Sequence, residues 1–135
     1  MRRYKAVLLA MCIIFFSASQ AAQAISWEHD LTQALKEASG KGSPVMADFY
    51  TEWCGWCKKL DSDTYSDKSV NDLSGKFICV KVDADKSSEL AGKYGVRGYP
   101  TIIFLNSKGD VVEKVVGYVD AEGLKKTMNK VLQLK

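Results

Sequence analysis

The chain carries Trp53-Cys54-Gly55-Trp56-Cys57-Lys58 shortly after an apolar run at residues 44–50. Two cysteines separated by two residues can close a small, reversible disulfide, which makes thiol–disulfide chemistry the first interpretation. The same spacing also supplies half of many zinc sites, so the motif alone does not separate the two chemistries. The sequence on either side of the motif has to distinguish them.

Two features outside the motif favour redox chemistry. Upstream, the apolar run at residues 44–50 predicts a buried central strand, and a single acid, Asp48, interrupts this run. Downstream, Gly98-Tyr99-Pro100-Thr101 leads into a second apolar run. A strand, a Cys-x-x-Cys motif and a distant X-Pro-Thr before another strand form a specific combination. Cys79 and His29, by contrast, are poorly spaced to complete a four-ligand zinc site.

The first residues have the composition of a secretory signal peptide. Residues 1–5 are basic, residues 6–18 are apolar, and Ala22-Gln23-Ala24 provides the small residues that a signal peptidase requires. The alternative is an uncleaved membrane anchor, but the apolar stretch rises only about 20 Å as a helix, against a hydrocarbon core of about 30 Å. We therefore expect residues 1–24 to be cleaved and the chain to be periplasmic, or otherwise secreted, without a stable membrane anchor.

The part of the chain that follows this leader is small and electrically balanced. It has 111 residues, which suits one domain with one core at residues 25–135. The leader holds three basic residues and no acid, so the remaining 16 basic and 16 acidic side chains give a formal charge of zero. Nucleic acids and anionic membranes are bound by clustered positive charge, so this composition argues against both as partners.

An odd number of cysteines remains once the leader, with Cys12, is removed. Disulfides persist outside the cytosol, and a purely structural framework would use an even number of cysteines. Cys54, Cys57 and Cys79 therefore suggest one working pair and one bystander. Cys79 lies in the apolar run at residues 77–82, where a small thiol suits a strand core better than a regulatory or resolving role.

The hydrophobic pattern predicts alternating strands and helices that end in a hairpin and a terminal helix. We expect strands at residues 25–28, 44–50, 77–82, 101–105 and 111–116. We expect helices at residues 31–39, 54–60, 67–73, 87–94 and after Asp120, with Asp30, Ser66 and Asp120 as N-caps. Gly40 and Gly42 should end the first helix, and the polar residues 61–64 should stop or kink the second.

This order of elements and the residues around the cysteines resemble the thioredoxin superfamily. Residues 48–58 are similar to its active-site segment, and residues 93–101 are similar to its cis-proline segment. The resemblance covers residues 25–135 and implies an α/β thioredoxin fold with a mixed five-stranded sheet flanked by helices. Residues 63–70 and 117–122 resemble exported thioredoxin-like proteins and the C-terminal periplasmic domain of the transmembrane thiol:disulfide interchange reductase DsbD.

The two cysteines are expected to have different roles. Backbone N–H groups and the helix dipole in a first helical turn favour a thiolate, the attacking species in exchange. We expect Cys54 to lie nearer the surface and attack, and Cys57 to resolve the mixed disulfide. Asp48 is the candidate base for Cys57, since burial should raise its pKa. The resemblance assigns Asp48 proton transfer and gives it Lys81 as a partner, and the alternative is a purely structural polar pair.

A second group of residues is expected to bind the partner polypeptide. Pro100 is flanked by Tyr99 and Thr101, and the resemblance implies a cis bond that exposes the preceding backbone to an extended strand. An ordinary trans proline is the alternative. Trp56 stands where cytosolic thioredoxins commonly have proline, and this difference leaves the redox potential open. Its side chain also offers an apolar docking surface. Trp53 is expected to pack against the fold.

The resemblance and these residues predict an exported thiol:disulfide oxidoreductase that exchanges a Cys54–Cys57 disulfide with protein thiols and disulfides through mixed disulfides. We expect a monomeric periplasmic reductant or electron relay, with a membrane thiol reductase as electron donor and with no cofactor or metal. One alternative is a disulfide donor or isomerase. The other is a module of the same fold that binds extended peptides without turnover.

Overall fold

The computed structural model describes residues 23–134. Nearly all of the predicted leader, including Cys12, lies outside these residues, so the expected cleavage and export stay predictions. Across residues 23–134, every helix is too short or too polar to cross a membrane.

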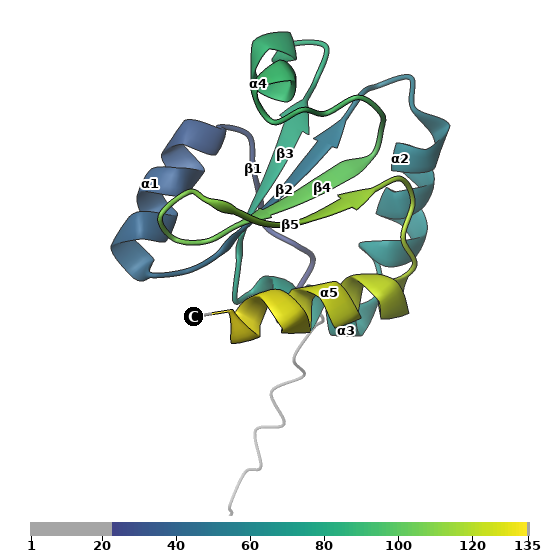
Figure 1. Ribbon diagram of the computed structural model, residues 1–135. Helices are drawn as coiled ribbons and strands as arrows, with labels where there is room; N and C mark the ends of the chain where they lie inside the picture. Colours follow the sequence, from purple (N-terminus) through teal and green to yellow (C-terminus); the bar gives the residue numbers. More distant parts are fainter. Residues whose placement is uncertain (1–22, 135) are drawn as a thin grey trace, which may run out of the picture.

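A five-stranded mixed sheet forms the centre of the molecule (Figure 1). Its order is β1-β3-β2-β4-β5, in which β1, β3 and β2 run parallel and β4 runs antiparallel to both of its neighbours. The strands are β1 (Trp27–Glu28), β2 (Val45–Tyr50), β3 (Ile78–Asp83), β4 (Thr101–Leu105) and β5 (Val111–Val116). This arrangement confirms the mixed α/β sheet expected from the sequence.

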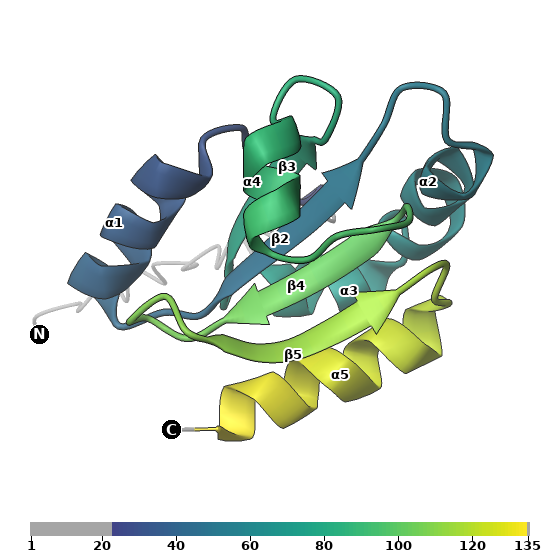
Figure 2. The same ribbon diagram turned by 45° about the horizontal axis from the view of Figure 1, so that its top comes forward.

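Helices cover both faces of the sheet. Figure 2 shows α4 in front of the sheet and α3 behind it. The first face carries α1 (Leu31–Lys41) and α4 (Ser88–Lys93). The second face carries α2 (Gly55–Lys59), the π-helical turn η1 (Leu60–Thr64), α3 (Lys68–Ser74) and α5 (Ala121–Gln133).

The alternation of side chains along β2 divides its residues between two hydrophobic cores. Ala47 and Phe49 are fully buried in the core beneath α1 and α4. Met46 is fully buried in the core that Leu60 of η1 and Leu124 of α5 also enter. Asp48 alternates with Ala47 and Phe49, so its side chain lies on the face covered by α2 and η1.

The end of α1 differs from the expectation. Asp30 is the N-cap, as predicted, and its side chain accepts a hydrogen bond from the backbone N–H of Gln33 at 3.1 Å. Gly40 does not end the helix, because it lies inside the last turn. Gly42 alone ends it, with a left-handed φ of 65° that glycine adopts without steric cost.

The start of α3 is also corrected by the structure. Asp67, and not Ser66, is the N-cap, because its carboxylate accepts from two backbone N–H groups, those of Ser69 at 2.9 Å and Val70 at 3.1 Å. The Ser66 hydroxyl instead donates to the carbonyl of Ser62 at 2.6 Å. Asp67 thus satisfies two N–H groups that the start of a helix leaves unpaired, whereas the Ser66 hydroxyl is bonded to the preceding turn, which explains the shift by one residue. The expected N-cap at Asp120 is confirmed.

The α-helix after the cysteines ends at Lys59, and the chain continues through the expected break at residues 61–64 as the π-helical turn η1. This turn is closed by a hydrogen bond from the Tyr65 N–H to the Leu60 carbonyl at 3.0 Å. The Thr64 hydroxyl donates to the Val119 carbonyl at 2.6 Å and ties the turn to the segment before α5. These tertiary contacts outweigh the poor helix propensity of the polar residues. The π-helical turn changes the direction in which the following side chains point.

Candidate active site

The cysteine pair lies where the chain leaves the sheet. β2 ends at Tyr50, and a short turn brings the chain to Cys54 at the start of α2. A disulfide joins Cys54 to Cys57, and their Cα atoms are 5.3 Å apart. Cys54 is 6% exposed and Cys57 is 2% exposed, so the first cysteine is the more accessible one, as expected. The structure therefore describes the oxidised form of the pair.

Cys54 is the N-cap residue of α2, one position before the first turn in which it was expected. Its Sγ accepts a hydrogen bond from the backbone N–H of Cys57 at 3.1 Å, as a capping oxygen would. Once the disulfide is reduced, the same N–H and the helix dipole would stabilise negative charge on this sulfur. The local backbone thus favours a thiolate at Cys54.

Asp48 and Lys81 form a buried ion pair on the sheet face that α2 covers. They lie opposite each other on the adjacent strands β2 and β3, and Lys81 Nζ donates to Asp48 Oδ2 at 2.7 Å. Asp48 is fully buried, and the Lys81 side chain is 11% exposed. The structure brings together the two residues that the family resemblance paired, while their role in proton transfer stays a prediction.

The surroundings of Asp48 favour its protonated form. Burial raises the pKa of Asp48 above its ordinary value, and the positive charge of Lys81 offsets only part of this effect. Burial also opposes the charge on Lys81, but the attraction of Asp48 and Asp61 outweighs it and raises the pKa of Lys81. Lys81 therefore stays charged near neutral pH, whereas the proton affinity of Asp48 moves toward the range that proton exchange requires.

The raised pKa of Asp48 predicts a pH-dependent stability. The folded protein holds this proton more firmly than the unfolded chain, whose aspartates have a pKa of about 3.9. The contribution of Asp48 to stability is therefore full below about pH 4 and is lost as the pH rises through the raised folded-state pKa. Asp48→Asn removes this loss and leaves Lys81 its Asp61 partner, so it should be the more stable protein at about pH 8.

Urea unfolding of the wild type and Asp48→Asn across this pH range measures the effect. The free energy of unfolding of the two proteins should diverge as the pH rises. A difference in unfolding free energy that stays constant with pH would contradict the raised pKa of Asp48. It would mean that Asp48 binds its proton equally well in the folded and the unfolded protein.

Asp61 is a third member of this charged group, and the sequence analysis missed it. It lies on η1, and its Oδ1 accepts from Lys81 Nζ at 2.5 Å. Its side chain is 51% exposed, so Lys81 links the buried Asp48 to a carboxylate at the surface. Asp61 follows Cys57 by about one helical turn, and residues at that spacing share a helix face. This spacing is the signal that could have identified it.

The proline segment lies at the same end of the sheet as the cysteine pair. Thr101 begins β4 and pairs with Phe49, the residue before the end of β2. The Tyr99–Pro100 peptide bond is cis. The Tyr99 ring meets that of Trp53 edge-on, with centroids 6.1 Å apart. Pro100 and its two neighbours therefore lie beside the turn that leads into the cysteine pair.

Two exposed tryptophans flank the disulfide. Trp56, between the cysteines, is 59% exposed, and its ring centroid lies 5.7 Å from that of Tyr118. Trp53 packs against the fold through its edge-on contact with Tyr99, as expected, but 70% of its surface stays exposed. Its indole N–H donates to Asp85 at 2.9 Å, and this polar partner holds the ring at the surface. The two indoles make the surface around the disulfide partly apolar.

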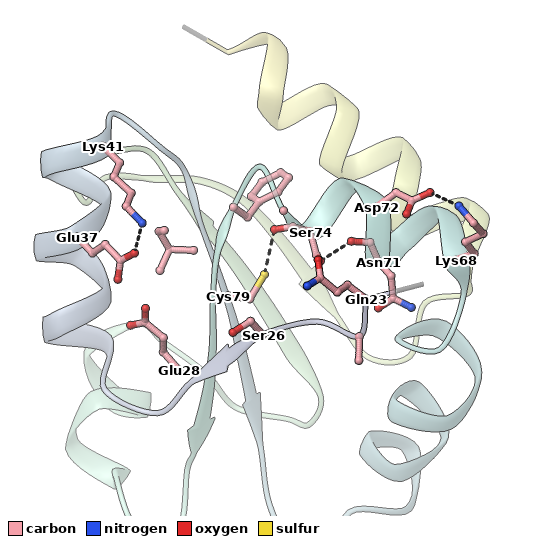
Figure 3. A pocket seen from close by; sticks show the side chains of 14 residues that line it. Gln23, Ser26, Glu28, Glu37, Lys41, Lys68, Asn71, Asp72, Ser74 and Cys79 are labelled. Atoms are coloured by element: carbon pink, nitrogen blue, oxygen red, sulfur yellow. Dashed lines mark hydrogen bonds and ion pairs between the residues drawn. The ribbon is translucent and has the colours of Figure 1, made fainter. Parts of the chain in front are cut away.

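Cys79 lines a cavity at one end of the sheet (Figure 3). Burial raises the pKa of the Cys79 thiol to about 12. Together with Glu28, Glu37 and Asn71, Cys79 lines a cavity of about 620 Å³ near the amino-terminal end of β3. The cysteine pair follows the carboxyl end of β2, which runs parallel to β3, so the cavity lies at the opposite end of the sheet. Cys79 is thus a buried strand residue whose raised pKa keeps the thiol protonated at neutral pH.

The remaining candidate ligands do not gather around the cysteines. Among residues 23–134, no three or more His, Cys, Asp and Glu side chains are arranged to hold a metal ion. His29 is exposed, directly before the cap of α1. The described part of the chain therefore offers Cys54 and Cys57 no set of further ligands.

Comparisons with known sequences agree with this geometry. The family model described as a thioredoxin-like domain matches residues 31–132. Thioredoxin of Bacillus subtilis is 40% identical over 86 residues, which are 64% of this chain and 80% of that protein. The thiol:disulfide interchange protein DsbD of Salmonella typhimurium is 38% identical over 104 residues. This match spans 73% of the chain but only 18% of DsbD.

Solved structures show the same arrangement of strands and helices. A thioredoxin from Thermus thermophilus matches with a TM-score of 0.73 and 27% identity, over 82% of this chain and 89% of the other. The oxidoreductase DsbH matches with a TM-score of 0.73 and 20% identity, over 85% of this chain and 89% of the other. At that identity the second likeness concerns the fold alone.

Proposed function

Since this chain belongs to the thioredoxin superfamily and is a thiol:disulfide oxidoreductase, we propose that it serves as an exported reductant or electron relay for protein disulfides. The observation that carries the proposed relay is the 38% identity with DsbD, a protein named for thiol:disulfide interchange. The basic and apolar composition of residues 1–24 supports export to the periplasm.

The reaction passes two electrons from the reduced cysteine pair to a partner disulfide. The Cys54 thiolate attacks one partner sulfur, forms a mixed disulfide and releases the other partner sulfur as a thiolate. Cys57 then loses its proton and attacks the Cys54 sulfur. The Cys54–Cys57 bond forms, and the second partner sulfur leaves. The partner disulfide is thereby reduced to two thiols, and the cysteine pair is oxidised.

Asp48 accepts the proton that Cys57 loses. Its burial on the face beneath α2 and its raised pKa suit a group that takes and returns a proton. Lys81 stabilises the carboxylate that remains when the proton has left. Asp61 holds the same ammonium group from the solvent side, so the charge of Lys81 is shared between a buried and an exposed acid.

The partner polypeptide docks on the surface around the disulfide. Trp56 supplies exposed apolar area directly between the cysteines. Tyr99, Pro100 and Thr101 lie beside the cysteine turn, where an extended segment of the partner can run along the backbone. A membrane thiol reductase is the proposed electron donor, in line with the relation to DsbD.

Equilibration with glutathione tests the direction. We expect a reduction potential near the value of about −270 mV found for thioredoxin, to which the chain is 40% identical over 86 residues. The fractions of oxidised and reduced protein are measured by alkylation of free thiols across a series of glutathione ratios. A potential near about −120 mV, typical of strong disulfide donors, would overturn the reductant proposal in favour of the donor alternative.

A further inference from the structure

Tyr65 carries a buried hydroxyl that the exchange steps above do not use. Its ring meets Trp27 edge-on, with centroids 4.9 Å apart, and belongs to the core beneath α2 and η1. The hydroxyl oxygen has no hydrogen-bond partner among the described residues. An unpartnered buried hydroxyl costs stability, so packing alone would favour phenylalanine at this position.

A second unpaired oxygen belongs to Asp48. Its Oδ2 accepts from Lys81, whereas its Oδ1 is buried and, within residues 23–134, lacks a partner. Lys81 Nζ lies 2.7 Å from Asp48 Oδ2 and 5.0 Å from the centre of the Tyr65 ring. One ammonium group therefore has the carboxylate and the phenol as neighbours, and each of them has a free oxygen.

The two side chains affect each other's ionisation. Burial raises the pKa of Asp48, and the Tyr65 hydroxyl lowers it in part. Burial, and then the negative charge of Asp48, holds the pKa of Tyr65 well above its ordinary value. Tyr65 therefore keeps its proton at neutral pH and is a hydrogen-bond donor for an ionised carboxylate, which is an acceptor only.

We propose that Tyr65 is a positioning residue for thiol–disulfide exchange, whose hydroxyl donates to the free oxygen of Asp48 when Asp48 is ionised. The inference rests on the proposed role of Asp48 as the base for Cys57. The transferred proton moves from the Cys57 sulfur to Asp48, and Tyr65 keeps its own proton throughout. Tyr65 thus adjusts the proton affinity of the base without entering the reaction.

Several other groups also face Asp48, and the test has to leave them unchanged. Its strand neighbour Ile102 on β4 is uncharged. The titratable groups around it are Lys81 on β3, Asp61 on η1, Tyr50 on β2 and, after reduction, Cys57 on α2. Tyr65→Phe keeps every one of these groups and the ring that packs against Trp27, so it removes the hydroxyl alone.

A two-phase reaction separates the cysteines. Reduced protein is mixed rapidly with an equal amount of dithiobis(nitrobenzoate), which releases one coloured thiolate when Cys54 attacks and a second when Cys57 closes the disulfide. In Tyr65→Phe, the ionised Asp48 carboxylate lacks the hydrogen bond that the Tyr65 hydroxyl would donate. The pH midpoint of the second phase should therefore rise by about one unit. Below the midpoint the second phase should be about tenfold slower, and the first phase should not change.

Tyr94→Phe is the matched control, because Tyr94 packs against Phe49 on the opposite face of the sheet. It should leave both phases as in the wild type. The carboxyl carbon shift of Asp48, followed by NMR against pH in the reduced wild type and Tyr65→Phe, gives the same comparison without kinetics.

The possible results separate the two proposals. A raised midpoint in Tyr65→Phe alone supports the role of Tyr65. Coincident second phases in Tyr65→Phe and the wild type, with a slowed second phase in Asp48→Asn, overturn the role of Tyr65 and leave Asp48 as the base. An unslowed second phase in Asp48→Asn overturns both roles, and release of both coloured thiolates by Cys54→Ser overturns the exchange mechanism itself.

Discussion

Cys54→Ser is expected to abolish the reduction of insulin disulfides, leaving only the background rate of dithiothreitol. Cys54 is the more exposed cysteine of the pair, and its sulfur occupies the capping position of α2. A serine hydroxyl in that position neither ionises near neutral pH nor forms a bond to sulfur, so no mixed disulfide can form. The turbidity of precipitating insulin B chain, followed with and without the protein, measures the rate.

Two further variants give this experiment its controls. Cys57→Ala keeps the attacking sulfur but cannot resolve the intermediate, so a mixed disulfide on Cys54 should accumulate. Capture of a membrane thiol reductase on this variant would support the relay. Cys79→Ala should keep the full rate, because the Cys79 thiol is buried and its pKa is about 12. Insulin reduction that survives in Cys54→Ser would contradict the assignment of the nucleophile and favour a role in peptide binding without turnover.

The sheet could be predicted from sequence because its central strands are nearly uniform apolar runs. β4 is buried at all five of its positions, and β2 is buried at every position except Tyr50. Such runs leave little choice of conformation or of position in the fold. Asp48 was visible for the same reason, since a single acid in a buried strand is conspicuous. The pairing with Lys81 came from the family resemblance and agrees with the strand register.

The residues that sequence reasoning missed depend on tertiary contacts. Asp61 reaches Lys81 because the helix continues through η1, and local propensity predicted a break there. Trp53 was expected only to pack against the fold, and its bond to the side chain of Asp85, far away in sequence, could not be foreseen. Tyr65 follows a polar stretch and gives no local signal of burial. In each case the deciding partner lies on another element.

Asp48→Asn is expected to slow closure of the disulfide by Cys57 about 100-fold, the usual contribution of one proton acceptor, without slowing attack by Cys54. Asparagine has the size and shape of aspartate but cannot take a proton from the thiol. Lys81 keeps Asp61 as a partner at 2.5 Å, so the substitution does not leave an unpaired buried ammonium. The second phase of thiolate release measures closure, and in Asp48→Asn it should lose the pH dependence that the Asp48 carboxyl gives the wild type.

Asp61→Asn distinguishes proton transfer from simple electrostatics. Like Asp48→Asn, it removes one negative charge that is paired with the Lys81 ammonium group, but it leaves Asp48 in place as the proton acceptor. Its effect on the rate of disulfide closure should therefore be below about tenfold. Equal slowing by the two variants would mean that Asp48 acts only through its charge. If Asp48 and Lys81 formed a purely structural pair, Asp48→Asn would leave closure unchanged. A variant that is both more stable at neutral pH and slower to close its disulfide is instead what a buried catalytic acid predicts, because the group then costs stability and is retained for its chemistry.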